Sequence, residues 1–157
     1  MTYDELLVQA DLEGLMVKEK FLQSGDGRIF NNRIAIRGDI NTTIEKSCVL
    51  AEEIGHYRTG IGDITRPDTI SDQKQEYRAR MVGYDIKVGL SGIICAFEKG
   101  VRSKAEMADY LDVTEEYLSA ALDAYRKKYG KYVSFENYII SFEPHFSVCK
   151  ALKDFTD

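Results

Sequence analysis

The stretch that decides the fold is residues 42–57, which read TTIEKSCVLAEEIGHY. Thr42 stands three positions before Glu45, and this spacing is that of a capping box, which starts a helix. Apolar residues then recur at helical spacing, namely at Ile44, Val49, Leu50, Ile54 and Tyr57. The pattern predicts an amphipathic helix that begins at Thr42 and ends near Gly60.

Inside this helix, Glu52 and His56 are four residues apart and therefore project from one face, one turn from each other. A helix can offer two ligands to one divalent metal in this way. Glu53 is next to the first ligand and can reach the outer side of the same metal. The motif E-E-x-x-H has the spacing of the metalloprotease motif H-E-x-x-H, with Glu52 in place of the first histidine. The alternative is a solvated acidic face, which is common on helices.

A third ligand is expected from a second long helix, which the pattern places at about residues 71–88, after a loop that contains Pro67. Glu76, Ala79 and Gly83 share one face of it, and Glu76 is the only large side chain there. Small residues let two helices pack closely, and Gly55 in the first helix indicates the same close approach. The alternative is an ion pair in water with a basic neighbour on the same helix, namely Lys74, Arg78 or Arg80.

The rest of the chain predicts an α+β fold in a single, mostly helical domain. A small antiparallel N-terminal sheet, with a hairpin at residues 28–37, is expected to pack on a zincin-like helix pair. Residues 1–100 would hold this hairpin and the metal-site helices, and residues 101–157 a helical packing unit and tail. The expected outer elements are a helix at residues 2–12, helices at 93–99, 103–110 and from 114 onward, and strands at 138–142 and 146–149.

The composition excludes several classes of protein. With only two histidines among 157 residues, the chain cannot build a site from three imidazoles. The net charge of −5 is spread over both halves, and neither half has the basic excess of a protein that binds phosphate backbones. The acidic N-terminus, the lack of a long apolar run and three widely separated cysteines lead us to expect a cytoplasmic protein with reduced thiols.

Two segments carry a resemblance to a known family, namely residues 48–57 and 75–80, the latter reading QEYRAR. Both are similar to the ImmA/IrrE family of metallo-endopeptidases, in a branch common in phages and integrated elements of Gram-positive bacteria. Further similar segments are residues 3–7, 32–36, 110–116, 129–130 and 138–144.

The resemblance implies a metal-dependent peptidase in which Glu53 is the general base, and His56 and Glu76 are the second and third ligands. Glu52 stands where most of the family has histidine. The resemblance implies zinc; because one imidazole and two carboxylates make a harder site, manganese or iron are alternatives. The implied partner is a helix-turn-helix repressor of a phage or mobile element, which the protein cleaves or otherwise inactivates. The rival interpretation is a non-catalytic antirepressor or binding module of the same fold.

Three other features have two interpretations each. Cys48 lies one turn before Glu52, so it is either a soft ligand or, as a free cysteine among apolar neighbours, part of the core. His145 is either a fourth ligand or oxyanion stabiliser, or an ordinary loop residue. Residues 103–130 have helix-turn-helix spacing, but Glu115 and Glu116 would occupy the positions that contact a DNA groove. We therefore expect a packing unit there, and no direct contact with nucleic acid.

Overall fold

The computed structural model describes residues 1–60 and 69–151, so the loop expected around Pro67 lies outside the described residues. The elements, in chain order, are α1 (Tyr3–Leu12), β1 (Met16–Lys20), β2 (Gly27–Phe30), β3 (Arg33–Arg37), α2 (Thr43–Arg58), α3 (Ile70–Lys87), α4 (Leu90–Glu98), α5 (Lys104–Leu111), α6 (Glu115–Tyr129), β4 (Tyr132–Phe135), β5 (Tyr138–Ser141) and β6 (Ser147–Lys150). This confirms the α+β class. The capping box predicted at Thr42 is present, and Ser103 forms another at the start of the helix expected at residues 103–110.

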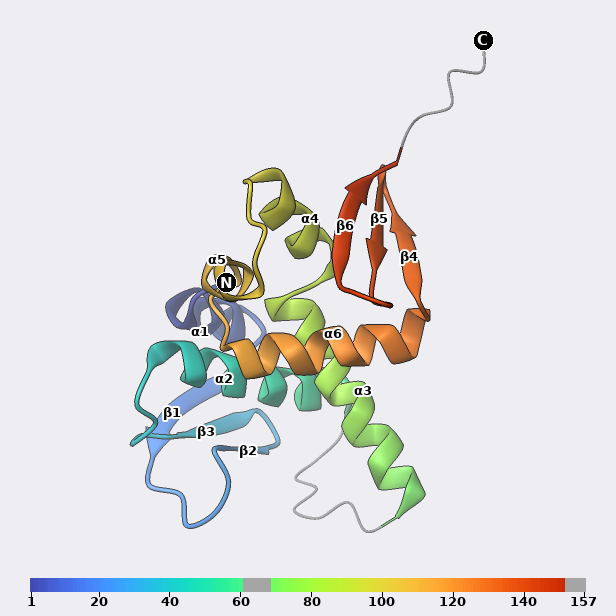
Figure 1. The fold of residues 1–157 in the computed structure, drawn as a ribbon. Coiled ribbons are helices and arrows are strands. Elements are labelled where there is room, and N and C mark those ends of the chain that lie inside the picture. Colours follow the sequence, from blue (N-terminus) through green and yellow to red (C-terminus); the bar gives the residue numbers. More distant parts are fainter. Residues whose placement is uncertain (61–68, 152–157) are drawn as a thin grey trace.

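The N-terminal sheet has the order β1-β3-β2 (Figure 1). The hairpin of β2 and β3 is antiparallel as predicted, and Asn31 in its turn has a φ of +53°. The expectation of a purely antiparallel sheet is wrong, because β1 pairs in parallel with β3. The chain leaves β1, crosses to the far side of β3 as β2 and returns through the hairpin, so β1 and β3 run in the same direction.

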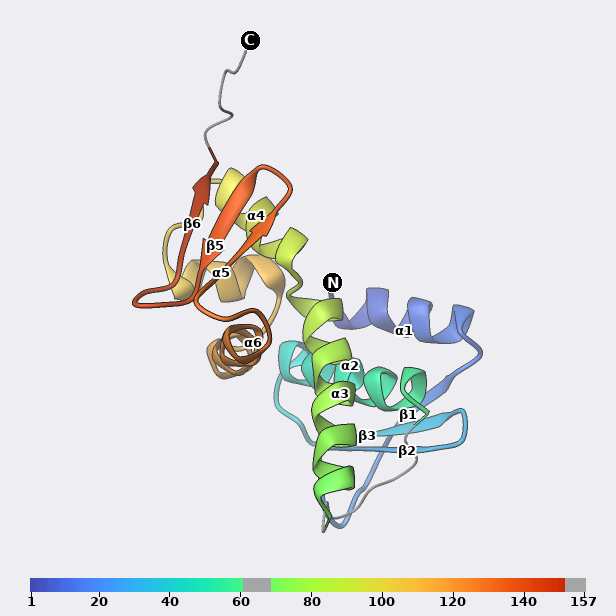
Figure 2. The same cartoon turned by 90° about the vertical axis from the view of Figure 1, so that its right-hand side faces the viewer.

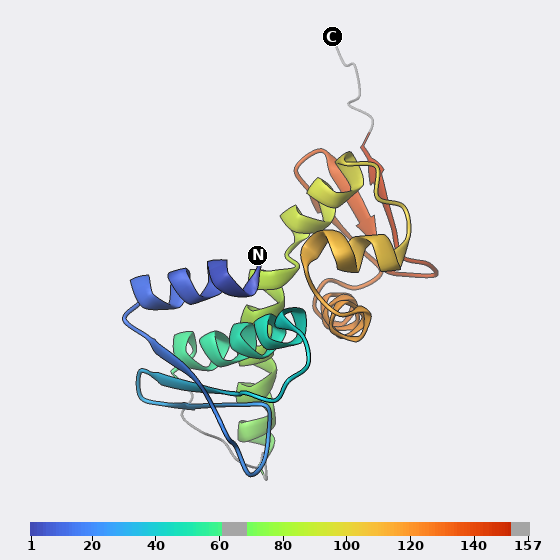
Figure 3. The ribbon, with the colours of Figure 1, turned by 90° about the vertical axis from the view of Figure 1, so that its left-hand side faces the viewer.

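The N-terminal helices cover one face of this sheet. Figures 1 and 3 show α2 above the strands and α1 beyond it, with no described helix on the opposite face. Ile29, Ile34 and Ile36 point from the strands into a buried cluster that also includes Leu50 and Ile54 of α2. These residues alternate with less buried ones along the strands, because successive side chains of a strand point to opposite faces.

A second buried cluster joins α4, α5 and α6 to the antiparallel sheet β4-β5-β6 (Figure 2). Tyr125 of α6 is fully buried in it, and its hydroxyl donates a hydrogen bond to Asp85 Oδ1 of α3 at 2.9 Å. Strand β4 is an element that the sequence pattern missed. The structure also places α4 in this cluster, although the sequence grouped it with the metal-site helices.

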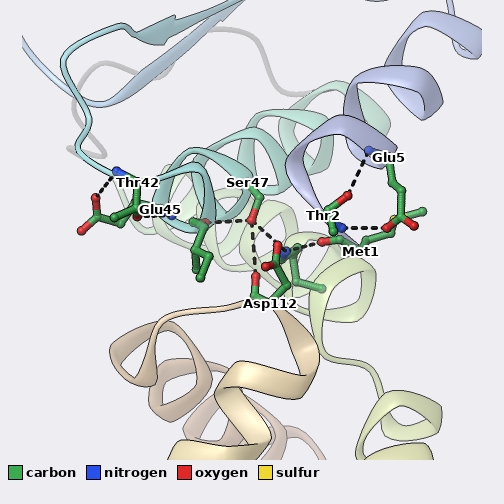
Figure 4. A network of polar contacts seen from close by, with 9 residues as sticks. Met1, Thr2, Glu5, Thr42, Glu45, Ser47 and Asp112 are labelled. Atoms are coloured by element: carbon green, nitrogen blue, oxygen red, sulfur yellow. Dashed lines mark hydrogen bonds and ion pairs between the residues drawn. The ribbon is translucent and has the colours of Figure 1, made fainter.

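The two clusters meet at a buried lysine, Lys87, at the end of α3. Its ammonium group donates hydrogen bonds to the Ser47 hydroxyl, at 2.7 Å, and to the Met1 carbonyl, and lies 3.5 Å from Asp112 Oδ2. Figure 4 shows this network between α2, the N-terminus and the end of α5. Burial lowers the pKa of Lys87. A serine beside a lysine can act as a nucleophile with its base, but Ser47 and Lys87 are both buried and cannot reach a substrate. We therefore assign this contact a structural role, in which it links the two buried clusters.

Candidate metal centre

The centre is built on the crossing of α2 and α3, where the two backbones touch. A Cβ added to Gly55 would lie 2.1 Å from the Ala79 carbonyl oxygen, and one added to Gly83 would lie 3.2 Å from the Ala51 carbonyl oxygen. Both distances are shorter than ordinary van der Waals contact. The close approach that Gly55, Ala79 and Gly83 predict is therefore confirmed, and only glycine fits at position 55.

This crossing brings together the three side chains that the sequence indicated as ligands. Ligand atoms of Glu52, His56 and Glu76 all lie within 4.8 Å of one another. His56 Nε2 is 3.6 Å from Glu76 Oε2, and the two side chains are 12% and 19% exposed. Tetrahedral ligands with metal bonds of about 2.1 Å stand about 3.4 Å apart, so this separation suits one small divalent cation.

The donor chemistry also suits a cation. Two carboxylates and one imidazole are the oxygen and nitrogen ligands that zinc and related metals bind in proteins. Among the residues that the structure describes, His56 Nδ1 is buried and has no hydrogen-bond partner. Because Nε2 is the nitrogen that faces Glu76, Nδ1 is not the atom that would bind the cation. The group can hold one divalent metal ion, and its geometry leaves open which metal that is.

Arg80, one turn after Glu76 on α3, is the cation nearest to the group in the structure. Its Nε lies 2.9 Å from Glu76 Oε1 and 3.3 Å from Glu52 Oε1. Burial lowers the pKa of Arg80, but the attraction of the two carboxylates outweighs it and raises this pKa above its usual value. The structure thus shows the ion pair with Arg80, and the other carboxylate oxygen of Glu76 faces His56, where a metal ligand is expected.

Glu53, the predicted general base, lies on a different side of α2 from the ligand Glu52. Successive residues of a helix are rotated by about 100°, so Glu53 turns toward the sheet while Glu52 faces α3. Its side chain is 8% exposed, and a Cβ added to Gly27 of β2 would lie 2.6 Å from its Oε1. Gly27 thus makes room for this carboxylate.

The two further candidates lie outside the ligand group. Within residues 1–60 and 69–151, the group that includes Glu52 contains neither Cys48 nor His145. Cys48 belongs to the second buried cluster, and burial raises the pKa of its thiol. This supports the packing interpretation of Cys48. His145 is exposed between β5 and β6, in the sheet that covers α4 to α6.

Two tyrosines that sequence reasoning missed lie beside the centre. Tyr84 of α3 and Tyr117 of α6 stack edge to face, with ring centroids 5.2 Å apart. Burial raises the pKa of Tyr84; the positive charge of Arg80 opposes this rise, and the negative charges of Glu52 and Glu76 add to it. Tyr84 follows Arg80 by four residues, so the helical spacing of α3 could have indicated it. Tyr117 comes from α6, and only the tertiary structure brings it here.

Comparisons with protein-family models, with curated proteins and with solved structures give no match. The class of protein is therefore defined by the fold and the site alone. It is an α+β protein with a Glu-His-Glu group that can hold a divalent cation at a crossing of two helices. No helix among the described residues combines the length and the apolar character that crossing a bilayer requires.

Proposed function

We propose that this protein is a metal-dependent endopeptidase that cleaves a protein partner. The observation that carries the proposal is the convergence of Glu52, His56 and Glu76 within 4.8 Å, on two helices that touch through glycines. From the family resemblance, zinc is the metal that we propose; manganese and iron are alternatives because two carboxylates make the set harder.

The roles of the residues follow from their positions. A divalent cation held by Glu52, His56 and Glu76 would acidify a water molecule and polarise the scissile carbonyl. Glu53, one residue along the same helix, would accept the proton of that water and pass it to the leaving amine. Its burial beside Gly27 restricts the orientations of its carboxylate, which favours a single position for proton transfer.

The substrate strand would bind at β2. Strand β3 (Arg33–Arg37) offers no free edge to a substrate, because it is hydrogen-bonded on both sides, to β1 and to β2. β2 is an edge of the sheet, and it contains Gly27, which contacts Glu53. An extended peptide can add to such an edge through main-chain hydrogen bonds. From the family resemblance, we propose a helix-turn-helix repressor of a phage or mobile element as the substrate.

Arg80 supports a second candidate function, that of a non-catalytic antirepressor that binds its partner without cutting it. Its guanidinium contacts both Glu52 and Glu76, so these two carboxylates have a cationic partner even without a metal. Such an ion pair would stabilise the helix crossing and leave no Lewis acid at the site. The content of bound metal separates the two functions.

Metal analysis of the purified protein is the first test. The enzyme is expected to carry about one divalent ion per chain, and Glu52→Ala and His56→Ala should each abolish this binding. Glu116→Ala is the matched control, because Glu116 is an exposed acid at the start of α6, and it should leave the metal content unchanged. Metal-free protein that still binds its partner would favour the antirepressor.

Cleavage is the second test. The protein is mixed with the repressor encoded beside its own gene, and fragments are sought by mass spectrometry. Glu53→Gln should lower cleavage at least about 100-fold, because general-base catalysis contributes that much or more, while the metal stays bound. Undiminished cleavage by this variant would show that Glu53 is not the base.

A further inference from the structure

Arg80 engages one oxygen of each carboxylate in the ligand group. Its Nε donates hydrogen bonds to Glu76 Oε1, at 2.9 Å, and to Glu52 Oε1, at 3.3 Å. In Glu76 the other oxygen is Oε2, which faces His56 Nε2 at 3.6 Å. The ion pair with Arg80 and the ligand group therefore use different atoms of the same carboxylate.

The number of donor atoms that remain affects which cation the centre suits. Two carboxylates and one imidazole nitrogen have five donor atoms in all, and Arg80 engages two of them, which leaves three. Three protein ligands and one open position are the arrangement of catalytic zinc sites. Manganese and calcium prefer octahedral or larger sets of oxygen ligands, and calcium often takes both oxygens of a carboxylate. The contacts of Arg80 therefore favour zinc.

Arg80 also changes the charge of the ligand set. Glu52 and Glu76 together carry a charge of −2, and the guanidinium that contacts both brings the sum to −1. Carboxylates suit hard cations such as manganese and calcium, whereas imidazole suits zinc. A carboxylate whose second oxygen is bonded to a cation offers one donor atom and less negative charge. In these two respects it is closer to an imidazole than a free carboxylate is.

The position of Arg80 follows from the spacing on α3 and from the helix crossing. Arg80 is four residues after Glu76, so the two side chains lie on one face of α3, one turn apart. Figure 2 shows α3 running across α2, and this crossing brings Glu52 within reach of the same guanidinium. The Arg80 side chain is 53% exposed, so the core does not require it. A substitution at this position is therefore expected to leave the fold intact.

We propose that Arg80 is a positioning residue that makes the metal centre selective for zinc over manganese. By holding one oxygen of Glu52 and one of Glu76, it restricts each carboxylate to a single donor atom. Groups that are hydrogen-bonded to ligating side chains orient the ligands and tune the metal in this way. The inference rests on the proposed metal-dependent function, and it adds the residue that selects the ion.

The competing interpretation is that Arg80 acts only as a positive charge that repels the metal. Such repulsion would weaken the binding of zinc and of manganese by the same factor, because the two ions carry equal charge. The ratio of the two dissociation constants cancels this factor and keeps the effect of ligand geometry. The selectivity ratio, not the affinity for either ion, is therefore the quantity to measure.

Dissociation constants for zinc and for manganese are measured on the full chain, by competition with a chromophoric chelator. Arg80→Gln should lower the preference for zinc over manganese at least about 10-fold, since loss of a group that orients metal ligands changes metal binding by about 10–100-fold. Arg78→Gln is the matched control, because it removes an exposed arginine from the same helix, and it should keep the ratio of the parent protein. An unchanged ratio in Arg80→Gln, or an equal change in both variants, would overturn the proposal.

A second variant, Arg80→Lys, tests whether the hydrogen bonds and charge of Arg80 are what matters. A single nitrogen of Arg80 makes both contacts, so an ammonium group can replace it. The ratio of Arg80→Lys should therefore lie closer to that of the parent protein than to that of Arg80→Gln. A ratio as low as that of Arg80→Gln would overturn the proposal. Circular dichroism checks that each variant is folded.

The outcomes also separate this inference from the proposed function. Parent protein that binds neither zinc nor manganese would overturn both. Parent protein that binds zinc, together with an unchanged ratio in Arg80→Gln, would overturn only the role of Arg80. In that case the cleavage test with Glu53→Gln would still decide whether the protein is a peptidase.

Discussion

Two helix pairs have sequence patterns that are typical of functional sites: α2–α3 has metal-ligand spacing, and α5–α6 has helix-turn-helix spacing. The structure shows that the two pairs pack differently. In the α2–α3 pair the backbones touch, because glycines lie at the crossing. The long side chains beside the crossing, among them Glu52, His56 and Glu76, converge on one point. In the α5–α6 pair, Met107, Leu111 and Leu118 lie in the buried cluster, while Glu115 and Glu116 are exposed.

The difference shows what makes a helix pair into a site. Large apolar residues hold two helices about 8–10 Å apart, and the polar side chains then lie on the outside. Small residues let the axes approach, so that polar side chains at the margin of the contact can meet. The helix-turn-helix spacing of α5 and α6 thus serves packing, as the sequence predicted, whereas the small residues of α2 and α3 serve the ligand group.

The largest expected effect is that of Gly55→Ala. This change would remove the difference between the two helix pairs, because it forces α2 and α3 apart. Alanine gains about 1 kcal/mol of helix propensity, but its Cβ would meet a backbone oxygen of Ala79, so we expect a net loss of about 2–3 kcal/mol and of the bound metal. Urea unfolding and metal analysis measure the two losses.

The control is Gly92→Ala in α4, where the added Cβ would be 3.1 Å from a side-chain methyl of Leu111. A side chain can move more easily than a backbone, so this variant should keep its stability within about 0.5 kcal/mol. Equal losses in the two variants would contradict the role that we assign to the backbone contact.

Gly27→Ala would separate the two roles that we propose for α2, namely proton transfer by Glu53 and metal binding by Glu52 and His56. Its Cβ would meet the Glu53 carboxylate and a methyl group of Val49, and neither Glu52 nor His56 is among the atoms nearest to it. We therefore expect cleavage to fall about 100-fold, as for loss of the base, while the metal content stays near that of the parent protein. Loss of metal in this variant would show that the ligand group depends on the sheet.

Lys87→Met would test the polar junction between the two clusters. Removing the ammonium group leaves Ser47 and the Met1 carbonyl without their donor, so we expect a loss of about 1–2 kcal/mol near neutral pH. The folded-state pKa of Lys87 is lowered, so in the range just below its ordinary value of 10.5 the unfolded chain binds more protons than the folded one. The stability of the parent protein therefore gains from this group as pH rises through that range.

The variant lacks this gain, so its deficit relative to the parent protein should grow as pH rises toward 10.5. Urea unfolding of both proteins at several pH values measures the deficit. Lys99→Met, at an exposed lysine after α4, provides the control and should show no such trend. A deficit that shrinks as pH rises would mean that Lys87 is not buried as the structure shows.

The last prediction concerns the rates at which the three cysteine thiols react, and it involves no change in stability. Cys95 and Cys149 are exposed, whereas Cys48 is buried in the second cluster and its thiol pKa is raised. Because the thiolate is the reactive form, Ellman's reagent should label two thiols rapidly in the folded protein and the third only in denaturant. Rapid labelling of Cys48 would reopen its role as a ligand.

The sequence predicted the local features of the fold well, because they depend on neighbours within a few residues. The capping boxes at Thr42 and Ser103 and the turn at Asn31 are interactions between residues at most three apart. The parallel pairing of β1 was missed, and so was β4, since a strand of four residues carries little periodicity.

For the site, the sequence determined that Glu52 and His56 share a helix face, and that α3 presents Glu76 among small residues. Only the tertiary structure decided that these three meet, that Arg80 contacts both carboxylates, and that Glu53 turns toward Gly27. The physical reason is the sequence separation over which the interactions act. Helical spacing is local, whereas a crossing angle and a strand register depend on contacts between residues far apart in the chain.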